Sequence, residues 1–321
     1  MNRSKVLITG ANGFVGRYLT HYLVSEGLSI NCAMRTDTVL DDKIDKKILI
    51  PSIYGRTDWT EALSGREVVI HLAARVHVMN DTSVDPLAEF RKVNVDGTLN
   101  LARQAASAGV KRFIFISSVK VNGEHTEAGK PFVEDVAPNP QDAYGLSKLE
   151  AEQGLLKIAQ ETGMEVVIIR PPLVYGAGVK ANFASMMRAV KRGVPLPLGA
   201  IHNKRSFVYV GNLVSMIMRC IDHPAAANQV FLVSDCHDLS TTELLRCCAV
   251  ALRVKARLLP VPQKFIEVCA NLLGKRAVAQ RLCGNLQLDI TKASTMLGWT
   301  PPFSVADGLQ VTAIDLLNTD K

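Results

Sequence analysis

The chain of 321 residues lacks the features that mark membrane-spanning and disulfide-rich secreted proteins. No stretch approaches the ~18 consecutive apolar residues that cross a bilayer. The apolar run near the N-terminus is interrupted at Gly10 and Asn12, which makes it a poor secretory signal. The seven cysteines are odd in number and form no C-x-x-C pair, so we expect free thiols in a reducing compartment. These absences predict a cytoplasmic protein without an integral membrane segment.

Signatures of metal and nucleic-acid binding are missing as well. The seven histidines lack the H-x-x-x-H and H-E-x-x-H spacings of metal ligands, so we expect no metal site. The net charge is +7, but the basic residues are spread out, with no arginine-rich run and no zinc-finger or RNA-binding motif. The positive charge therefore favours a phosphate-bearing cofactor and substrate over nucleic acid.

The first half of the chain alternates short apolar runs with segments of helical period. The runs are residues 5–9, 29–34, 67–73, 112–118 and 165–170. Strands that are apolar throughout and alternate with helices are typical of a parallel sheet covered on both faces. The pattern predicts an α/β fold with a Rossmann-type, doubly wound parallel sheet.

The composition changes after residue 175, where proline, glycine and short elements become more frequent. We predict an NAD(P)-binding Rossmann domain over residues 1–175 and a smaller C-terminal substrate lobe over 176–321, with some elements returning to the first domain. Ser240 and Glu243 have the spacing of a capping box, which predicts that a helix begins there.

A glycine-rich loop follows the first predicted strand and precedes a helix. Gly10, Gly13 and Gly16 are spaced as G-x-x-G-x-x-G. Glycines in this context allow a tight turn, and the following helix N-terminus presents N–H groups to a pyrophosphate. The loop, including Asn12 and Phe14, is predicted to bind a dinucleotide.

The end of the second predicted strand bears on the choice of dinucleotide. An NAD site usually has an acidic residue about 20 residues beyond the loop, whereas Arg35 lies nineteen residues after Gly16. A guanidinium suits the 2′-phosphate of NADP(H), which we favour, while Asp37 two residues later keeps NAD(H) open. Asp58 is predicted to meet the adenine edge.

Tyr144 and Lys148 are four residues apart at the start of a predicted helix. A phenol has a pKa near ~10 and acts as a general acid or base only if its phenolate is favoured. The nearby ammonium of Lys148 is expected to favour it. Ser118, after the predicted strand that begins at residue 112, is the candidate hydroxyl for orienting a carbonyl or alcohol.

These motifs resemble the extended short-chain dehydrogenases/reductases, in the group of sugar-nucleotide epimerases, dehydratases and reductases. The matching stretches are "TGANGFVG", "HLAA", "NVDGTLNLA", "ISSVKVNG", "YGLSK", "RPPLVYG" and "RSFVYVGNL", in the family's order. The resemblance implies that Tyr144 is the acid/base, that Lys148 lowers its pKa and holds the cofactor ribose, and that Ser118 hydrogen-bonds the reacting oxygen.

The resemblance also implies further binding residues. Ala73 and Ala74 would line the nicotinamide side of the cofactor, and Arg170 would begin the family's turn after a strand. Asn182 is similar to the family's diphosphate-contacting asparagine, and Arg205 to the arginine that clamps the substrate phosphates. A bidentate arginine suits that task. In the same lobe, Arg276 or Arg281 is a further candidate for the substrate diphosphate.

Departures from the family pattern restrict the reaction. Val119 and Lys120 follow Ser118 where dehydratases carry Asp-Glu, which disfavours a 4,6-dehydratase, and Asn122 replaces a usual tyrosine. Two reactions at C4 of a UDP-linked (N-acetyl)hexose remain. We favour an NADPH-dependent reductase of a UDP-4-keto-6-deoxy-N-acetylhexosamine in bacterial surface-polysaccharide (O-antigen) biosynthesis, because of Arg35. The alternative is a 4-epimerase with tightly bound NAD.

Three further expectations concern the type of protein, contact with a membrane and the oligomeric state. A non-catalytic NAD(P)-binding regulator is disfavoured, because such proteins typically lose the tyrosine or the lysine. The amphipathic stretch 258–281 could lie on a membrane surface, which would suit a lipid-diphosphate sugar, although most such helices pack on a core. The resemblance implies a homodimer through two paired helices, for which residues 85–109 and 144–162 are the candidates.

Overall fold

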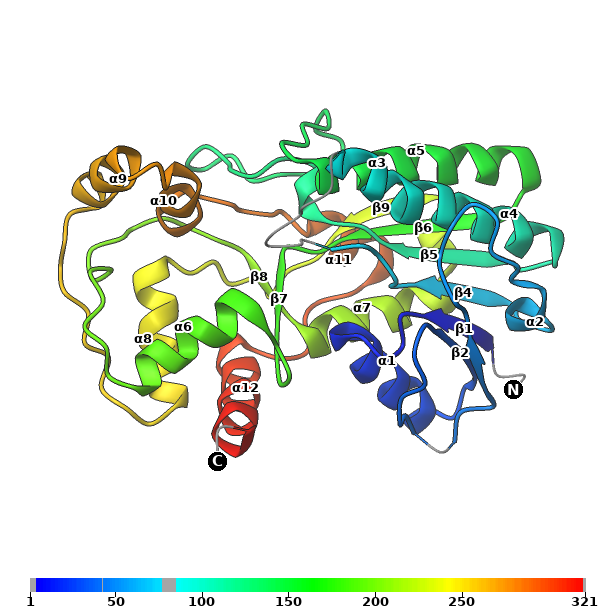
Figure 1. Ribbon diagram of the computed structural model, residues 1–321, viewed down its shortest axis with the longest axis horizontal. Coiled ribbons are helices and arrows are strands. Elements are labelled where there is room, and N and C mark those ends of the chain that lie inside the picture. Colours follow the sequence, from blue (N-terminus) through cyan, green and yellow to red (C-terminus); the bar gives the residue numbers. More distant parts are fainter. Residues whose placement is uncertain (1–3, 42, 77–84, 320–321) are drawn as a thin grey trace.

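The computed structural model describes residues 4–41, 43–76 and 85–319. Within them lies one large sheet of parallel strands, ordered β3-β2-β1-β4-β5-β6-β9 (Figure 1). The strands are β1 (Lys5–Thr9), β2 (Ser29–Met34), β3 (Lys46–Leu49), β4 (Val68–His71), β5 (Arg112–Ile116), β6 (Glu165–Arg170) and β9 (Gln229–Leu232). The strand order reverses between β1 and β4, which places a ligand crevice at their carboxyl ends. The predicted doubly wound class is confirmed.

Two apolar layers cover the sheet because successive side chains of its strands point to opposite faces. Val6 and Ile8 join a core with α1 (Phe14–Ser25), α7 (Val210–Asp222) and α11 (Thr291–Leu297). Leu7, between them, joins a second core on the other face. The helices that supply this second core are α2 (Thr60–Leu63), α4 (Thr98–Ser107) and α5 (Ala143–Thr162). Figure 1 shows α4 and α5 on one side of the sheet and α1 and α7 on the other.

The helical segment expected over 85–109 is divided into three parts. They are α3 (Pro86–Arg91), a π-helical turn η1 (Lys92–Gly97) and α4. Asp85 caps α3 by accepting a hydrogen bond from the N–H of Ala88. At the far end of the turn, a Cβ on Gly97 would lie 2.6 Å from the Ile53 carbonyl oxygen. The π-turn thus lets the segment pass close to the loop after β3, and such turns are frequent at functional sites.

Residues after 175 are divided between two places. β9, α7 and α11 complete the sheet and one of its apolar layers. A separate core is formed by a two-stranded sheet, β7 and β8, with three helices around it. These elements are β7 (Leu173–Tyr175), β8 (Phe207–Tyr209), α6 (Ala181–Lys191), α8 (Thr241–Ala251) and α12 (Val305–Thr319). The predicted capping box opens α8, since the Ser240 hydroxyl accepts from Glu243 N–H and the Glu243 carboxylate accepts from Ser240 N–H.

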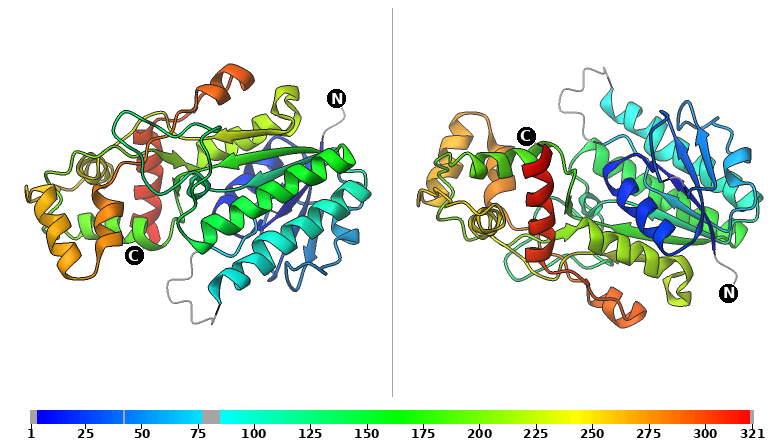
Figure 2. Two further views of the ribbon diagram at one scale, coloured as in Figure 1. Left: turned by 90° about the horizontal axis from the view of Figure 1, so that it is seen from above. Right: turned by 90° about the horizontal axis from the view of Figure 1, so that it is seen from below.

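Two helices lie at the end of the molecule farthest from the large sheet (Figures 1 and 2). They are α9 (Gln263–Leu272) and α10 (Arg276–Cys283), and they pack on each other. Short 3-10 turns occur at η2 (Val119–Val121) and η3 (Pro224–Ala226). Among the described residues, no helix combines the length and the apolar character that crossing a membrane requires.

Candidate active site

A cleft of about 740 Å³ opens at the carboxyl ends of β1, β2 and β4. It lies where the strand order reverses, as expected for a doubly wound sheet. Eight of the predicted cofactor-binding residues line it: Gly10, Asn12, Gly13, Phe14, Gly16, Arg35, Ala73 and Ala74. The loop, the end of β2 and the segment after β4 therefore meet in one cavity.

The glycines of the loop leave room that larger residues would fill. Gly10 has a φ of +74°, and a Cβ there would lie 2.9 Å from the Ala73 nitrogen. A Cβ on Gly16 would lie 2.1 Å from the Gly10 carbonyl oxygen. The first turn of α1 contains no acidic residue, so its N-terminal N–H groups face the cleft with their partial positive charge uncompensated. These features fit the pyrophosphate of a dinucleotide.

The contact at Gly16 leads to a test of the loop. Gly16→Ala is expected to raise the dissociation constant of the dinucleotide at least tenfold and to lower the melting temperature, because the methyl group forces the loop away from α1. Gly55→Ala is the matched control, since its Cβ would meet only Asp96 at 3.4 Å. Calorimetric titration and thermal unfolding would check both effects. Unchanged binding in Gly16→Ala would contradict the role of the loop.

The adenine end of the cleft is bordered by the segment after β2. Arg35 and Asp37 are both exposed, and Arg35 lines the cleft. The Asn12 amide donates to the hydroxyls of Thr36 (3.2 Å) and Thr38 (3.4 Å), which ties the glycine loop to this segment. Arg35 is thus positioned at the cleft mouth, where the adenosine half of a dinucleotide would lie.

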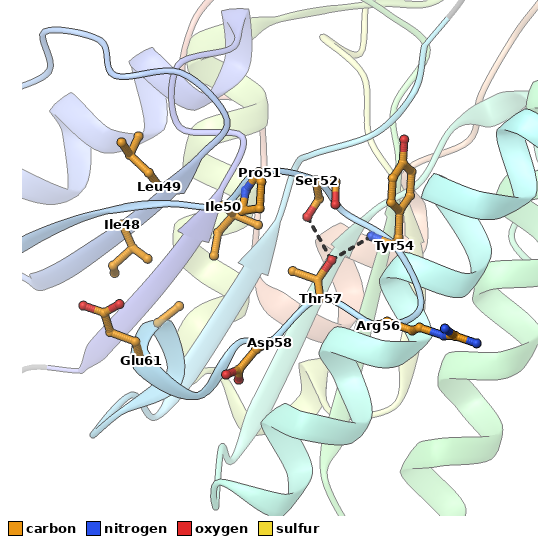
Figure 3. A pocket seen from close by; sticks show the side chains of 11 residues that line it. Ile48, Leu49, Ile50, Pro51, Ser52, Tyr54, Arg56, Thr57, Asp58 and Glu61 are labelled. Atoms are coloured by element: carbon orange, nitrogen blue, oxygen red, sulfur yellow. Dashed lines mark hydrogen bonds between the residues drawn. The ribbon is translucent and has the colours of Figure 1, made fainter.

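Asp58 lines a separate hollow of about 390 Å³ between β3 and α2 (Figure 3). Its carboxylate accepts hydrogen bonds from the N–H (2.9 Å) and the hydroxyl (2.6 Å) of Thr60, and these bonds lower the pKa of Asp58. Four residues line both the hollow and the cleft, namely Ile50, Pro51, Ser52 and Tyr54. Asp58 itself does not line the cleft. The structure thus gives Asp58 a hydrogen-bonding role at the start of α2.

Tyr144 and Lys148 lie in the first two turns of α5, beneath the end of β5. Asp142 caps this helix by accepting from Gly145 N–H at 2.7 Å. Lys148 is buried, and its ammonium donates to the Ile116 carbonyl at 2.8 Å and lies 4.3 Å from the centre of the Phe115 ring. The Lys148 nitrogen is 6.0 Å from the centre of the Tyr144 ring. The one-turn spacing therefore brings the phenol and the ammonium to the same sheet edge.

The Tyr144 ring is connected to the dinucleotide cleft through aromatic contacts. Its centre is 6.0 Å from that of Phe90, in an edge-to-face arrangement. The Arg75 guanidinium, which belongs to the cleft lining, lies 5.5 Å from the centre of the Phe90 ring. Tyr144 itself does not line the cleft, but Phe90 and Arg75 connect its ring to the segment after β4.

Burial dominates the titration of this pair. It lowers the pKa of Lys148 to about 7, against the opposing influence of the Glu152 carboxylate. Burial, with a smaller contribution from Asp142, also raises the pKa of Tyr144. The sequence predicts that Lys148 lowers the pKa of Tyr144. In the protein alone, burial of the phenol raises its pKa, and the Lys148 ammonium donates to the Ile116 carbonyl. The effect of Lys148 on the Tyr144 pKa therefore stays a prediction for the site with its ligands bound.

Ser118 follows β5 and is half-buried. Its side-chain oxygen accepts from Lys120 N–H at 3.2 Å, which caps η2 and leaves the hydroxyl hydrogen free to donate elsewhere. Lys120, found where dehydratases carry an acidic residue, forms ion pairs with Glu124 (3.0 Å) and Asp142. The ion pair between Lys120 and Asp142 therefore holds the segment after Ser118 against the start of α5.

A buried ion pair behind Lys148 was not anticipated from the sequence. Glu152 binds the Arg170 guanidinium through both carboxylate oxygens, at 3.0 and 2.6 Å, and accepts from the Ser117 hydroxyl at 2.5 Å. Arg170 also donates to the Asn122 side chain at 3.1 Å. The signal was present, because Glu152 lies four residues after Lys148 and thus on the same face of the helix.

His71 is a second buried polar residue whose role sequence reasoning missed. Its ring nitrogens contact the hydroxyls of Thr9 (2.7 Å) and Thr98 (2.9 Å). Burial, together with the charge of Lys148, lowers the pKa of His71 to about 3, so the ring is neutral near pH 7. It stacks on Phe115 and helps to hold β4, β5 and α4 at the site.

The predicted substrate residues lie in the C-terminal part of the chain. Arg205 is half-buried, and its guanidinium donates to the Gly284 carbonyl at 3.0 Å. Burial, then repulsion from Arg281, lowers the pKa of Arg205, while Glu124 opposes the shift. Of the two candidates left open, Arg281 is thus the one that interacts with Arg205. Arg276 is exposed in the first turn of α10, and Asn182 is exposed in the first turn of α6.

No cluster of three His, Cys, Asp or Glu side chains that could hold a metal occurs in the part of the chain that the structure describes.

Comparisons with known proteins find similar chains. A UDP-glucose 4-epimerase of Vibrio cholerae is 49% identical over 310 residues, which cover 96% of this chain and 94% of that protein. An undecaprenol-linked N-acetylglucosaminyl-diphosphate 4-epimerase of Escherichia coli O157:H7 is 28% identical, with 96% and 93% covered. The crystal structure of a UDP-glucose 4-epimerase from Thermotoga maritima with UDP-glucose superposes with a TM-score of 0.77, at 24% identity, over 99% of this chain and 100% of that one.

The family is settled by a match to most of the chain. Residues 6–234 match the model of the NAD dependent epimerase/dehydratase family, and this range contains the glycine loop, Ser118, Tyr144, Lys148 and Arg205. The resemblance seen in the sequence is thereby confirmed, as is an enzyme that uses a nicotinamide dinucleotide. The chain belongs to the NAD-dependent epimerase/dehydratase family.

Proposed function

We propose that this protein is a 4-epimerase that interconverts a UDP-linked hexose or N-acetylhexosamine with its C4 epimer. The observation that carries the proposal is the 49% identity, over nearly the whole of both chains, to a UDP-glucose 4-epimerase. The retained Ser118, Tyr144 and Lys148 support it. The non-catalytic regulator has no support, because its expected loss of the tyrosine or lysine is not found.

This proposal changes the preference that the sequence suggested. Arg35 favoured NADPH and hence a 4-keto reductase. An epimerase regains its cofactor unchanged in every turnover, so it needs no separate reductant. A preference for NAD or NADP at Arg35 therefore does not decide between the two reactions, and the similarity to the epimerase carries more weight. The identity of the dinucleotide stays a prediction, with NADP(H) favoured by the guanidinium.

The residues of the site suit this chemistry. A dinucleotide bound in the cleft would supply an acceptor for the C4 hydride, which an epimerase returns to the other face of the keto sugar. Tyr144 removes the proton of the C4 hydroxyl and later gives it back. Ser118 donates a hydrogen bond to the C4 oxygen, and the positive charge of Lys148 favours the phenolate. The cleft glycines hold the pyrophosphate of the cofactor.

Arg205 and Arg281 are the proposed ligands of the substrate diphosphate. Two guanidinium groups that repel each other in the free protein gain from an anion placed between them. Glu124, the carboxylate that acts on Arg205, is already paired with Lys120. The free protein thus keeps an excess of positive charge at this end of the site.

Removing one of these charges gives a measurable prediction. Arg205→Ala is expected to raise KM for the UDP-sugar by about 10–100-fold, the loss of about 1.5–3 kcal/mol for a hydrogen bond to a charged group, with a smaller change in kcat. Arg276→Ala is the control, because it removes an exposed arginine of the same lobe. Steady-state kinetics would check it, and an equal KM for both variants would contradict the assignment.

The proposed reaction is tested with the purified protein and no added cofactor. Incubation with UDP-glucose, and separately with UDP-N-acetylglucosamine, is expected to yield the C4 epimer by NMR, and the dinucleotide released on denaturation is identified by chromatography. Oxidation of NADPH by a UDP-4-keto-6-deoxy-N-acetylhexosamine, without interconversion of either UDP-sugar, would instead assign the reductase. Conversion of only a polyprenyl-diphosphate sugar would assign the lipid-linked reaction.

We also propose a homodimer and a role in surface-polysaccharide synthesis. α4 and α5 lie side by side on one face of the sheet, where the corresponding helices of a second copy could pair with them (Figure 2). Light scattering at micromolar concentration is expected to give twice the mass of one chain. The 4-epimerase of the lipid-linked sugar in Escherichia coli O157:H7 supports the polysaccharide role.

A further inference from the structure

The end of the molecule formed by residues 253–281, here called the tip, carries an unusual surface. It comprises the segment after α8 together with α9 and most of α10, and it lies at the pole opposite the large sheet (Figures 1 and 2). α9 contains no buried residue, although it packs on α10. A helix whose sequence is amphipathic but whose apolar side is not buried in a core has an unpartnered face.

The apolar face of α9 points outward. Phe265, Val268 and Leu272, at spacings of three and four residues, are 62%, 57% and 83% exposed. Leu273, immediately after the helix, is 71% exposed, and Val278 on α10 is 50% exposed. Lys264, Glu267 and Asn271 each precede one of these residues by one position, so they lie on the adjoining side of α9. The tip therefore presents a stripe of large apolar side chains to solvent.

The tip also holds a concentrated positive charge. Residues 253–281 include seven Lys and Arg and one Glu, a net charge of +6, whereas the whole chain has +7. All seven basic residues are exposed: Arg253, Lys255, Arg257, Lys264, Lys275, Arg276 and Arg281. The remaining 292 residues are thus almost neutral, and the positive charge of the protein lies mainly around the apolar stripe.

We propose that the tip binds the surface of an acidic lipid bilayer, with α9 lying in the interface. Exposed Phe and Leu side chains surrounded by Lys and Arg are the combination that inserts among acidic headgroups. A second copy of this chain is disfavoured as the occupant, because a two-fold contact would place two +6 surfaces against each other. The inference is independent of the reaction proposed for the site.

The position of the tip connects the membrane to the site. α10 carries Arg281, which interacts with Arg205, so the proposed diphosphate site adjoins the face that would meet the headgroups. A bound protein would therefore keep its anion-binding arginines close to the bilayer. The diphosphate of a lipid-linked sugar would then lie within reach of Arg205 and Arg281. A soluble UDP-sugar could enter the site of the membrane-bound protein and of the free protein alike.

Vesicle flotation tests the proposal with the full-length protein. We expect binding to vesicles of 70% phosphatidylcholine and 30% phosphatidylglycerol, little binding to pure phosphatidylcholine, and at least a tenfold loss of affinity at 0.5 M salt, because the headgroup attraction is screened. In a Phe265→Trp variant the emission should shift to the blue on binding and be quenched by brominated lipid. Equal partition into both kinds of vesicle, or no emission shift, would overturn the proposal.

Matched variants separate the two contributions. The variant Phe265→Ser/Leu272→Ser should lose the bound state even at low salt, and Lys264→Glu/Lys275→Glu should lose it through charge. The control Val39→Ser/Ile314→Ser removes exposed apolar side chains elsewhere and should bind like the parent. All three should retain activity on the soluble UDP-sugar. Loss of a solution dimer in the first variant, with vesicle binding unchanged, would assign the face to a second copy and overturn the proposal.

Discussion

Replacing Tyr144 with Phe should lower kcat for C4 epimerisation by about 10²–10⁴-fold, the range typical of a lost general acid/base. In the proposed reaction the phenol oxygen takes the proton of the C4 hydroxyl, whereas the ring packs against Phe90. The variant keeps that packing, so KM and the melting temperature should change little. Steady-state kinetics with UDP-glucose would measure the loss. Tyr22→Phe, on the exposed side of α1, is the control and should be fully active.

The pH dependence provides a second readout of the same pair. The pKa of Lys148 is lowered to about 7 and that of Tyr144 is raised, so the first proton that the pair loses near neutral pH comes from Lys148. Above about pH 7 Lys148 is neutral, and the positive charge that favours the Tyr144 phenolate is lost. The value of kcat/KM should therefore fall as the pH rises through about 7. If the Tyr144→Phe variant kept the same pH dependence of kcat/KM, the role of the Tyr144 phenol as the general acid/base would be contradicted.

Much of the fold could be predicted because its signal is local. The apolar runs at 5–9, 29–34 and 165–170 match the bounds of β1, β2 and β6, since strands buried on both faces must be apolar throughout. No apolar run gives the bounds of β3, because only Ile48 in it is buried. β9 adds to the sheet from the second half of the chain, and its pairing with β6 depends on contacts between residues about 60 positions apart.

In the candidate site, too, some features could be predicted from short sequence patterns and others could not. The glycine loop and the spacing of Tyr144 and Lys148 are short-range patterns, so they could be placed in the sequence. The environment of Lys148 could not be predicted, because its partners Ile116 and Phe115 come from strand β5, about 30 residues earlier in the chain. Burial also raises the pKa of Tyr144, and a sequence does not show this desolvation.

Glu152→Gln should be the most destabilising of the substitutions considered, with an expected loss of about 3–5 kcal/mol in the free energy of unfolding. Both partners of the Glu152–Arg170 pair are buried, with side chains 3% and 6% exposed. The neutral amide leaves the guanidinium of Arg170 without a counter-charge, in a site that also contains the Lys148 ammonium. At this chain length a loss of that size corresponds to a fall of about 10 °C in melting temperature.

A double-mutant cycle distinguishes an uncompensated charge from lost packing. Arg170→Met added to Glu152→Gln should restore part of the stability, because no buried guanidinium then lacks a partner. Glu161→Gln, which removes an exposed carboxylate from the same helix, should change the free energy of unfolding by less than about 0.5 kcal/mol. Additive losses in the double variant would show that the charge of Arg170 is not the cause.

Glu152 should also influence the reaction through Lys148. Its carboxylate raises the pKa of the ammonium, so Glu152→Gln lets burial lower that pKa further below about 7. The fall of kcat/KM with rising pH should then begin at a lower pH, and kcat near neutral pH should decrease because less positive charge remains to favour the Tyr144 phenolate. If Glu152 contributed only to stability, the substitution would lower the melting temperature and leave the pH dependence of kcat/KM unchanged. Measuring kcat/KM against pH, at a temperature well below unfolding, therefore decides between the two roles. A shift of the curve to lower pH would show that Glu152 keeps the catalytic lysine charged.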